Sequence, residues 1–273
     1  MELIPVAKCI TVYPVKSLDG VLLQKAQIGN GGCLLHDREY AIRNSKGKFI
    51  NGKSNSLVHV LRSEVDFENE IISFRHESDT SWNRFHLQKE KQAVDTYLSE
   101  FFNEEAVLAK NPGGRFLDIP DFSGITVLST ASLESVSIWF DDMDIEETRK
   151  RFRATIEIDN VPAFWEDHLF AEAGTAIEFT IGDVTLMGMS PRARCIVPTR
   201  HPQTGEVIHA FPKTFAKHRA ELAPSWSGLD EYGHHYYLSV DCFIPSGQTG
   251  KWICTGDSIS LTGNKFTHKT LGF

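Results

Sequence analysis

The sequence predicts a mainly β protein of the α+β class, and three observations carry this prediction. The first is a series of short apolar runs, each of strand length and each bounded by turn residues. The second is that the chain lacks the alternation of strand and long helix that a doubly wound parallel sheet requires. The third is composition, because 41% hydrophobic and 11% aromatic residues among 273 are enough for real packed cores. We expect a β-barrel with flanking helices in the second half and a β-rich domain in the first.

Residues 1–115 are predicted to form the first domain. The segments Asn44 to Gly47 and Asn51-Gly52 are turn signals between its strands. Apolar residues at spacings of three and four predict a helix over 91–103 whose apolar stripe faces the core. Asn111-Pro-Gly-Gly114 then interrupts the chain, and we place the domain boundary just after it. The expected strands are 7–13, 21–28, 39–44, 57–63, 71–76 and 83–87.

Residues 116–273 are predicted to form the second domain. Ser129 and Thr130 are typical N-cap residues and begin a helix that runs through 139–140, while Asp144 with Glu147 forms a variant capping box for a short turn of helix. Gly182-Asp183 predicts a tight hairpin, because glycine supplies the positive φ of a type II′ turn. A small helix is expected over 214–222. The expected strands are 125–128, 155–158, 176–181, 184–189, 196–199, 236–240 and 258–261.

Charge and cysteine content narrow the class of protein. A formal net charge of −8, from 36 acidic and 28 basic residues, argues against a nucleic-acid-binding protein. Five cysteines without a C-x-x-C pair form neither a disulfide framework nor a zinc pattern and favour a reducing compartment. The sequence has no signal-peptide pattern at its start and no apolar run long enough to span a membrane. We therefore expect a cytoplasmic protein with no membrane partner.

Cys195 is the main candidate for a functional residue. It follows Arg192 and Arg194, whose charges would favour the thiolate that a nucleophile or a soft-metal ligand needs. A lone cysteine is also commonly a small buried hydrophobe, and in a regular strand both arginines would face away from the thiol. The residues alone leave these two interpretations open. The remaining cysteines, which we expect to be structural, are Cys9, Cys33, Cys242 and Cys254.

Several motifs, taken in order, resemble those of one family. In the first half these are the segment 12–17 (VYPVKS) and Asp37-Arg38, and in the second half Arg151-Phe-Arg153, Gly182-Asp183, Arg194-Cys195 and the turn 202–205. The chain resembles proteins in which an N-terminal MOSC β-barrel domain precedes a MOSC domain, the module named for the molybdenum cofactor sulfurases. It is most similar to the stand-alone group that includes the mitochondrial amidoxime-reducing component and its bacterial relatives.

The resemblance implies a molybdenum–pyranopterin (Mo-molybdopterin) cofactor. Cys195 would be both the metal ligand and the catalytic residue, since a soft anionic sulfur suits this metal. Cationic forks and point charges would hold the pterin phosphate. Two positions depart from the family pattern, with Ala193 where serine is common and Ala154-Thr155 where Pro-Asn is common. The residues implied to bind the cofactor are Lys16, Ser17, Arg38, Asp121, Ser123, Arg153, Arg194 and Cys195.

The implied activity is reduction of a small N-hydroxylated or N-oxygenated compound. The chain has no C-x-x-C cluster, haem motif or dinucleotide fingerprint, so the electrons would come from a separate flavin or iron–sulfur protein. Two alternatives stay open: a sulfurtransferase in which Cys195 carries a persulfide, although no pyridoxal phosphate domain accompanies it, and a carrier of the molybdenum cofactor. His201 and His209 could donate protons, but polarity of the loop is their expected role. The adjacent His234 and His235 are not expected to bind one metal ion, because neighbours in a strand point to opposite faces.

Overall fold

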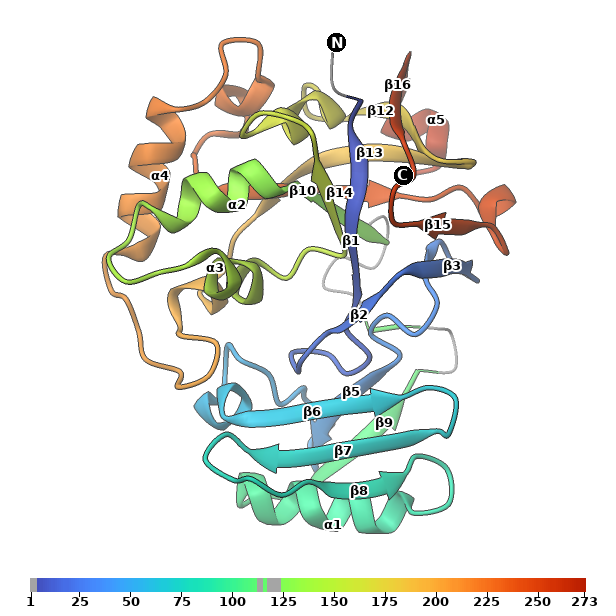
Figure 1. Ribbon diagram of the computed structural model, residues 1–273, viewed down its shortest axis with the longest axis vertical. Coiled ribbons are helices and arrows are strands. Elements are labelled where there is room, and N and C mark those ends of the chain that lie inside the picture. The colour runs from blue at the N-terminus through green and yellow to red at the C-terminus, as the bar shows by residue number, and fades with distance from the viewer. Residues whose placement is uncertain (1–3, 112–114, 117–123) are drawn as a thin grey trace.

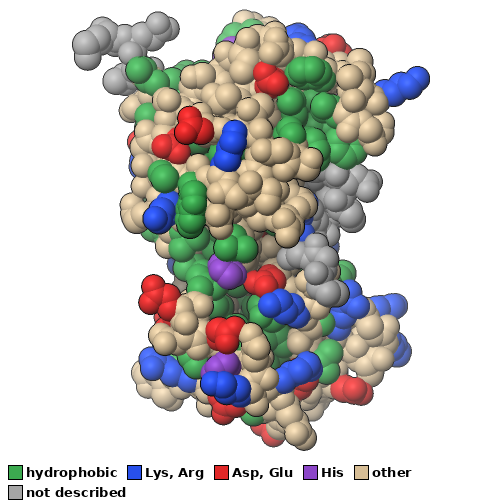
Figure 2. All heavy atoms as spheres, turned by 90° about the vertical axis from the view of Figure 1, so that its right-hand side faces the viewer, with side chains coloured by type: hydrophobic (Ala, Val, Ile, Leu, Met, Phe, Trp, Pro, Cys, Tyr) green, Lys and Arg blue, Asp and Glu red, His purple; other side chains and the backbone are tan. Residues whose placement is uncertain are grey.

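The computed structural model describes residues 4–111, 115–116 and 124–273. Their strands form one eight-stranded sheet and three smaller sheets, and the molecule has two parts stacked along its long axis (Figure 1). We call the part built on the eight-stranded sheet the barrel, and the part built from residues 40–110 the small lobe. Figure 2 shows that the molecule narrows where the two parts meet. The mainly β fold class is confirmed.

The barrel sheet is antiparallel except where β10 runs parallel to β11. The first strand also bridges the start of the last one: Val6 pairs with Ser258, and the Ala7 N–H donates to the Asp257 carbonyl at 2.9 Å. This contact brings the two ends of the sheet together around a core of aliphatic residues and phenylalanine. In order across the sheet, the strands are β16 (Ile259–Thr267), β12 (Thr175–Ile181), β13 (Val184–Ala193), β14 (Tyr237–Phe243), β10 (Ile125–Ser129), β11 (Ile156–Asp159), β1 (Val6–Val12) and β2 (Val21–Leu23).

The small lobe has its own core beneath the barrel. Its helix α1 (Lys91–Phe102) packs Val94, Leu98 and Phe102 inward, so the predicted apolar stripe is indeed core. Two sheets cover the helix (Figure 1). They consist of β5 (Tyr40–Asn44) with β9 (Ala106–Lys110), and of β6 (Leu61–Asp66), β7 (Ile71–His76) and β8 (Asn83–His86).

The first strands of the chain belong to the barrel rather than to the small lobe. Strand β1 pairs with β11 and β2, and β3 (Lys25–Gly29) pairs with β15 (Trp252–Cys254) and β4 (Cys33–Leu34). The chain therefore enters the barrel, crosses to the small lobe after β4 and returns after β9. The division of the sequence into domains 1–115 and 116–273 stays a prediction.

Three helices flank the barrel on one side (Figure 1): α2 (Thr130–Ser137), α3 (Ile145–Phe152) and α4 (Phe211–Glu221). The predicted caps are present, since the Ser129 side chain accepts from the Ser132 N–H and the Asp144 side chain accepts from the Glu147 N–H. An aromatic cluster packs these helices against the barrel. A short helix, α5 (His268–Leu271), ends the chain, and in the described residues no helix is long and apolar enough to cross a membrane.

Some predicted boundaries are wrong for identifiable reasons. The segment 196–199 is not a strand but the 3-10 helix η3 (Val197–Thr199), because Pro198 has no N–H and the Thr199 N–H donates to the Ile196 carbonyl at 3.0 Å. The segment 57–63 is divided into the 3-10 helix η1 (Ser56–His59), capped by Asn55, and β6. The strand expected at 184–189 continues to Ala193. Strands β4, β9 and β15 were not expected, and the remaining 3-10 helices are η2 (Trp165–Leu169), η4 (Gly228–Tyr232) and η5 (Ser246–Gln248).

Candidate functional site

Cys195 lies just beyond the end of β13, where the chain leaves the sheet. The two-residue turn at Gly182-Asp183 pairs Ile181 with Val184, and Gly182 has the predicted positive φ of 53°. Strand β13 ends at Ala193, so the alternation of faces no longer applies at the thiol. The thiol-bearing residue is exposed, whereas Cys33 and Cys242 are buried and Cys9 and Cys254 are half-buried. Cys195 is therefore not a core residue.

The two arginines beside Cys195 have different partners. The Arg192 guanidinium pairs with the buried Asp241 carboxylate at 2.5 Å, so its charge is balanced there. Arg194 Nη2 donates to the Phe152 carbonyl at 2.9 Å, while its Nε and Nη1 are buried and have no hydrogen-bond partner in the described part of the chain. Burial, followed by the charge of Arg192, lowers the pKa of Arg194 to about 10, and Cys195 acts in the opposite direction. Arg194 is thus a buried guanidinium, next to Cys195 in the chain, with two N–H groups that no described residue accepts.

Tyr236 adds a contact at this site that the sequence did not indicate. Its hydroxyl donates to the Cys195 carbonyl at 3.2 Å, and its own carbonyl accepts from the Arg194 N–H at 3.0 Å. Burial raises the pKa of Tyr236 to about 12, against the opposing effect of Arg194. The phenol is therefore neutral at physiological pH and can act as a donor. Tyr236, which directly precedes β14 (Tyr237–Phe243), thus fixes the backbone of Cys195.

A second cluster forms around the buried ring of Tyr13. The Arg153 guanidinium lies 4.0 Å from the ring centroid and that of Arg38 lies 5.2 Å from it. The Tyr13 N–H donates to Asp37 Oδ1 at 2.8 Å, and Asp37 also pairs with Arg38. The phenol donates to the Ala154 carbonyl at 3.3 Å. One aromatic ring therefore brings together two of the three arginines that the resemblance implied.

Both of these arginines are held in unusual backbone conformations. Arg38 has φ 53° and Arg153 has φ 54°, in the left-handed region that costs a non-glycine residue about 1 kcal/mol or more. Arg153 is the C-cap residue of α3. Burial lowers its pKa, and no carboxylate pairs with it among residues 4–111, 115–116 and 124–273. Strain and a desolvated, unbalanced charge in one residue are typical of a binding site.

Lys16 and Ser17 lie in the turn between β1 and β2. Lys16 is only 9% exposed, and its Nζ donates to the Phe116 carbonyl at 3.1 Å. Ser17 has a φ of 73°, so the turn is tight, and the Leu18 N–H closes it by donating to the Val15 carbonyl. Asp121 and Ser123, which the resemblance also implied, lie outside the described residues.

The histidines considered as proton donors have other contacts. His201 Nδ1 accepts the N–H groups of Gln203 and Thr204, and its Nε2 lies 3.5 Å from Glu147 Oε2, so His201 organises its loop. His209 is exposed. His235 pairs with Asp230 at 2.8 Å, and the described residues contain no group of three His, Cys, Asp or Glu side chains arranged for a metal ion.

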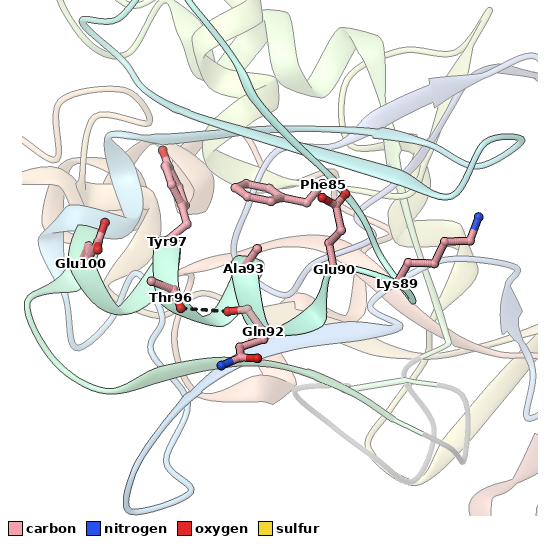
Figure 3. A pocket seen from close by; sticks show the side chains of 8 residues that line it. All are labelled: Phe85, Lys89, Glu90, Gln92, Ala93, Thr96, Tyr97 and Glu100. Carbon is pink, nitrogen blue, oxygen red and sulfur yellow. Dashed lines mark hydrogen bonds between the residues drawn. The ribbon is translucent and has the colours of Figure 1, made fainter.

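A surface hollow lies away from these groups, along α1 of the small lobe. Figure 3 shows its side chains, which come from α1, from the turn before it and from the end of β8. None of them is a predicted site residue. The residues lining the hollow are Phe85, Lys89, Glu90, Gln92, Ala93, Thr96, Tyr97 and Glu100.

Comparison with known families agrees with this arrangement. The family described as MOSC N-terminal beta barrel domain matches residues 5–109, and the family described as MOSC domain matches residues 121–260. The second match alone covers half of the chain. The chain belongs to the MOSC-domain family, whose domains are associated with molybdenum cofactor sulfurases and related proteins. No curated protein matches the chain significantly.

Proposed function

We propose that the protein binds a molybdenum–pyranopterin cofactor through Cys195 and reduces N-hydroxylated compounds. The observation that carries the proposal is that Arg194, which has two buried N–H groups without a partner in the described chain, adjoins the exposed Cys195 and contacts the residue before Arg153. Arg194 Nη2 donates to the carbonyl of Phe152, the residue that precedes Arg153. Arg153 in turn contacts the same Tyr13 ring as Arg38. Chain neighbours and these contacts therefore link Cys195 to the arginine pair.

The residues present fit an anionic cofactor. Arg194 has two buried N–H groups without a partner in the described chain, and a buried donor left unpaired costs about 1–3 kcal/mol, so these groups favour an acceptor from outside the protein. Arg153 brings a desolvated charge that a phosphate would balance. The Cys195 thiolate supplies the soft sulfur ligand that molybdenum prefers.

Each residue of the chain then has a definite task. Lys16, Arg38 and Arg153 would hold the phosphate end of the pterin. Ser17 and Ser123, with Asp121 nearby, would complete the polar lining through hydroxyl and backbone hydrogen bonds. Arg194 would offer its two unpaired N–H groups to the bound anion, and Tyr236 fixes the Cys195 backbone. When bound, the cofactor supplies oxygen-atom removal coupled to two electrons. Those electrons would come from a separate flavin or iron–sulfur protein in the cytoplasm, because nothing in the sequence indicates a second redox group.

Sulfur transfer is the second candidate, and the exposure of Cys195 favours it. A thiol at the surface, next to a guanidinium, can carry a persulfide to another molecule. A carrier of the cofactor would bind it through the same residues without turnover. The three functions therefore share a site and differ in what the loaded protein does.

The test combines turnover with sulfide release. Protein made in a host competent in molybdenum cofactor synthesis is given reduced viologen with hydroxylamine or an amidoxime. We expect reduction by the wild type and none by Cys195→Ala, while Cys254→Ala, a matched change at a half-buried cysteine, stays active. Release of one sulfide per chain on treatment with a thiol, without reduction of either substrate, would support sulfur transfer instead. Cofactor binding without either activity would support the carrier.

A further inference from the structure

The loop that follows Cys195 reaches across to the small lobe. After η3 the chain forms a turn in which the Gly205 N–H donates to the His201 carbonyl at 2.9 Å. The Gln203 side chain then donates to Glu77 Oε1 at 2.9 Å, from the barrel to the small lobe. The small lobe therefore adds a contact to this loop beyond the bonds within the loop and the contact of His201 with Glu147.

Arg62 is a second small-lobe residue that contacts this turn. Its side chain is 11% exposed, and Nη2 donates to the Pro202 carbonyl at 3.3 Å and to the His59 carbonyl at 2.6 Å. Its Nε lies 3.2 Å from Glu77 Oε2. The same carboxylate that accepts from Gln203 thus also pairs with Arg62, so the two contacts support each other.

The other end of the Arg62 guanidinium contacts the turn that carries Lys16 and Ser17. Nη1 lies 3.1 Å from Asp19 Oδ1, and Asp19 Oδ2 accepts from the Ser63 N–H at 2.9 Å. Asp19 follows Ser17 by two positions. One guanidinium therefore joins the turn after β1 to the turn after Cys195.

We propose that Arg62 is a positioning residue that fixes these two turns relative to each other. Neither the sequence motifs nor the residues assigned to the cofactor include it. Its effect on the cofactor rests on the proposed function, whereas its effect on the two turns follows from the contacts alone. Arginine is needed because its planar fork can meet two carboxylates and two carbonyls at once, which the single ammonium of lysine cannot do.

Hydrogen–deuterium exchange of the cofactor-free protein tests the positioning directly. In Arg62→Met we expect the amides of 16–19 and 199–206 to exchange about tenfold faster or more, because contacts to a charged donor are lost. Arg84→Met is the matched control, since Arg84 lies exposed on β8 of the same small-lobe sheet. It should leave both segments unchanged. Unchanged exchange of both segments in Arg62→Met would overturn the proposal.

Two more variants test whether the geometry of Arg62 or only its charge is needed, and keep the proposal testable if Arg62→Met does not fold. Arg62→Lys keeps the charge, and we expect it to protect at most one of the two segments; full protection of both would overturn the bridging role. Glu77→Ala removes the partner shared with Gln203 but leaves the Asp19 contact, so exchange should rise in 199–206 and not in 16–19. If Arg62→Met does not fold, unchanged exchange in Glu77→Ala overturns the proposal.

Molybdenum content then tests the consequence for the cofactor. After gel filtration of protein from a cofactor-competent host, we expect Arg62→Met to retain roughly a tenth or less of the wild-type molybdenum, and Arg84→Met to retain all of it. Wild-type retention by Arg62→Met would overturn the link between positioning and binding. If the wild type itself holds no molybdenum, the proposed function fails, and the exchange experiment alone decides the role of Arg62.

Discussion

Replacing Arg153 with methionine tests whether this residue binds the cofactor or stabilises the fold. The guanidinium lies 4.0 Å from the Tyr13 ring centroid, and Arg38 lies 5.2 Å from the same point, so the two charges are no further apart than the sum of these distances. At about 9 Å and an effective dielectric constant of about 20, two like charges repel by roughly 2 kcal/mol. Asp37 pairs with Arg38 and reduces this repulsion.

Two effects on the cofactor-free protein therefore oppose each other in Arg153→Met. The lost contact with Tyr13 destabilises by about 0.5–2 kcal/mol. The relieved repulsion and the removal of a desolvated charge stabilise by a similar amount, since burial already lowers the pKa of Arg153. The free energy of unfolding should change by less than about 1 kcal/mol, and Tm by no more than about 4 °C.

Cofactor binding should respond very differently to the same change. One or two hydrogen bonds to a phosphate contribute about 1.5–3 kcal/mol each, so occupancy should fall by roughly tenfold or more. The assays are differential scanning fluorimetry of cofactor-free protein and molybdenum content after gel filtration. Lys46→Met, at an exposed hairpin residue, should change neither quantity. A Tm loss of more than about 10 °C, or unchanged molybdenum in Arg153→Met, would refute the reasoning.

Two further predictions concern the thiol and a buried acid. Cys195→Ala should lose the metal while its Tm stays within a few degrees of the wild type, because the residue is exposed; loss of soluble protein would instead make Cys195 structural. Glu166 is buried in η2, where its carboxyl accepts from the Ser132 hydroxyl, and burial raises its pKa to about 7. Below the unfolded pKa of 4.5 this protonated carboxyl contributes its full stabilisation, and the contribution is lost as pH rises through about 7. Tm should therefore fall between about pH 4.5 and pH 7. Glu166→Gln should flatten that fall, and an equally steep fall in the variant would assign it to other groups.

The sequence indicated those parts of the fold that local chemistry decides. The Gly182 turn, the caps at Ser129 and Asp144 and the apolar stripe of α1 each depend on residues within a few positions of one another, and the structure has all of them. Local patterns failed where a single residue changed the secondary structure: with Pro198, the segment 197–199 is the 3-10 helix η3 instead of the expected strand. Pairings across the chain, such as β1 with β11 and with the start of β16, have no local signal.

In the candidate site, too, local motifs identified residues but not the contacts between them. Lys16, Arg38, Arg153 and Arg194 could be named from motifs, but the meeting of two arginines on the Tyr13 ring depends on tertiary structure. Both arginines beside Cys195 are expected to favour its thiolate, and this stays a prediction. The sequence did not indicate that Asp241, on β14, pairs with Arg192. Arg62 and Tyr236 could not be identified because their partners lie far away in the chain.

Metal and pterin analysis of the full chain tests the central claim most directly. The wild type, purified from a host competent in cofactor synthesis, should hold about one molybdenum and about one pterin per chain, and Cys195→Ala should hold little or no molybdenum. Cys254→Ala, made in the same host, should match the wild type. A folded wild-type protein that holds neither molybdenum nor pterin under these conditions would contradict the account.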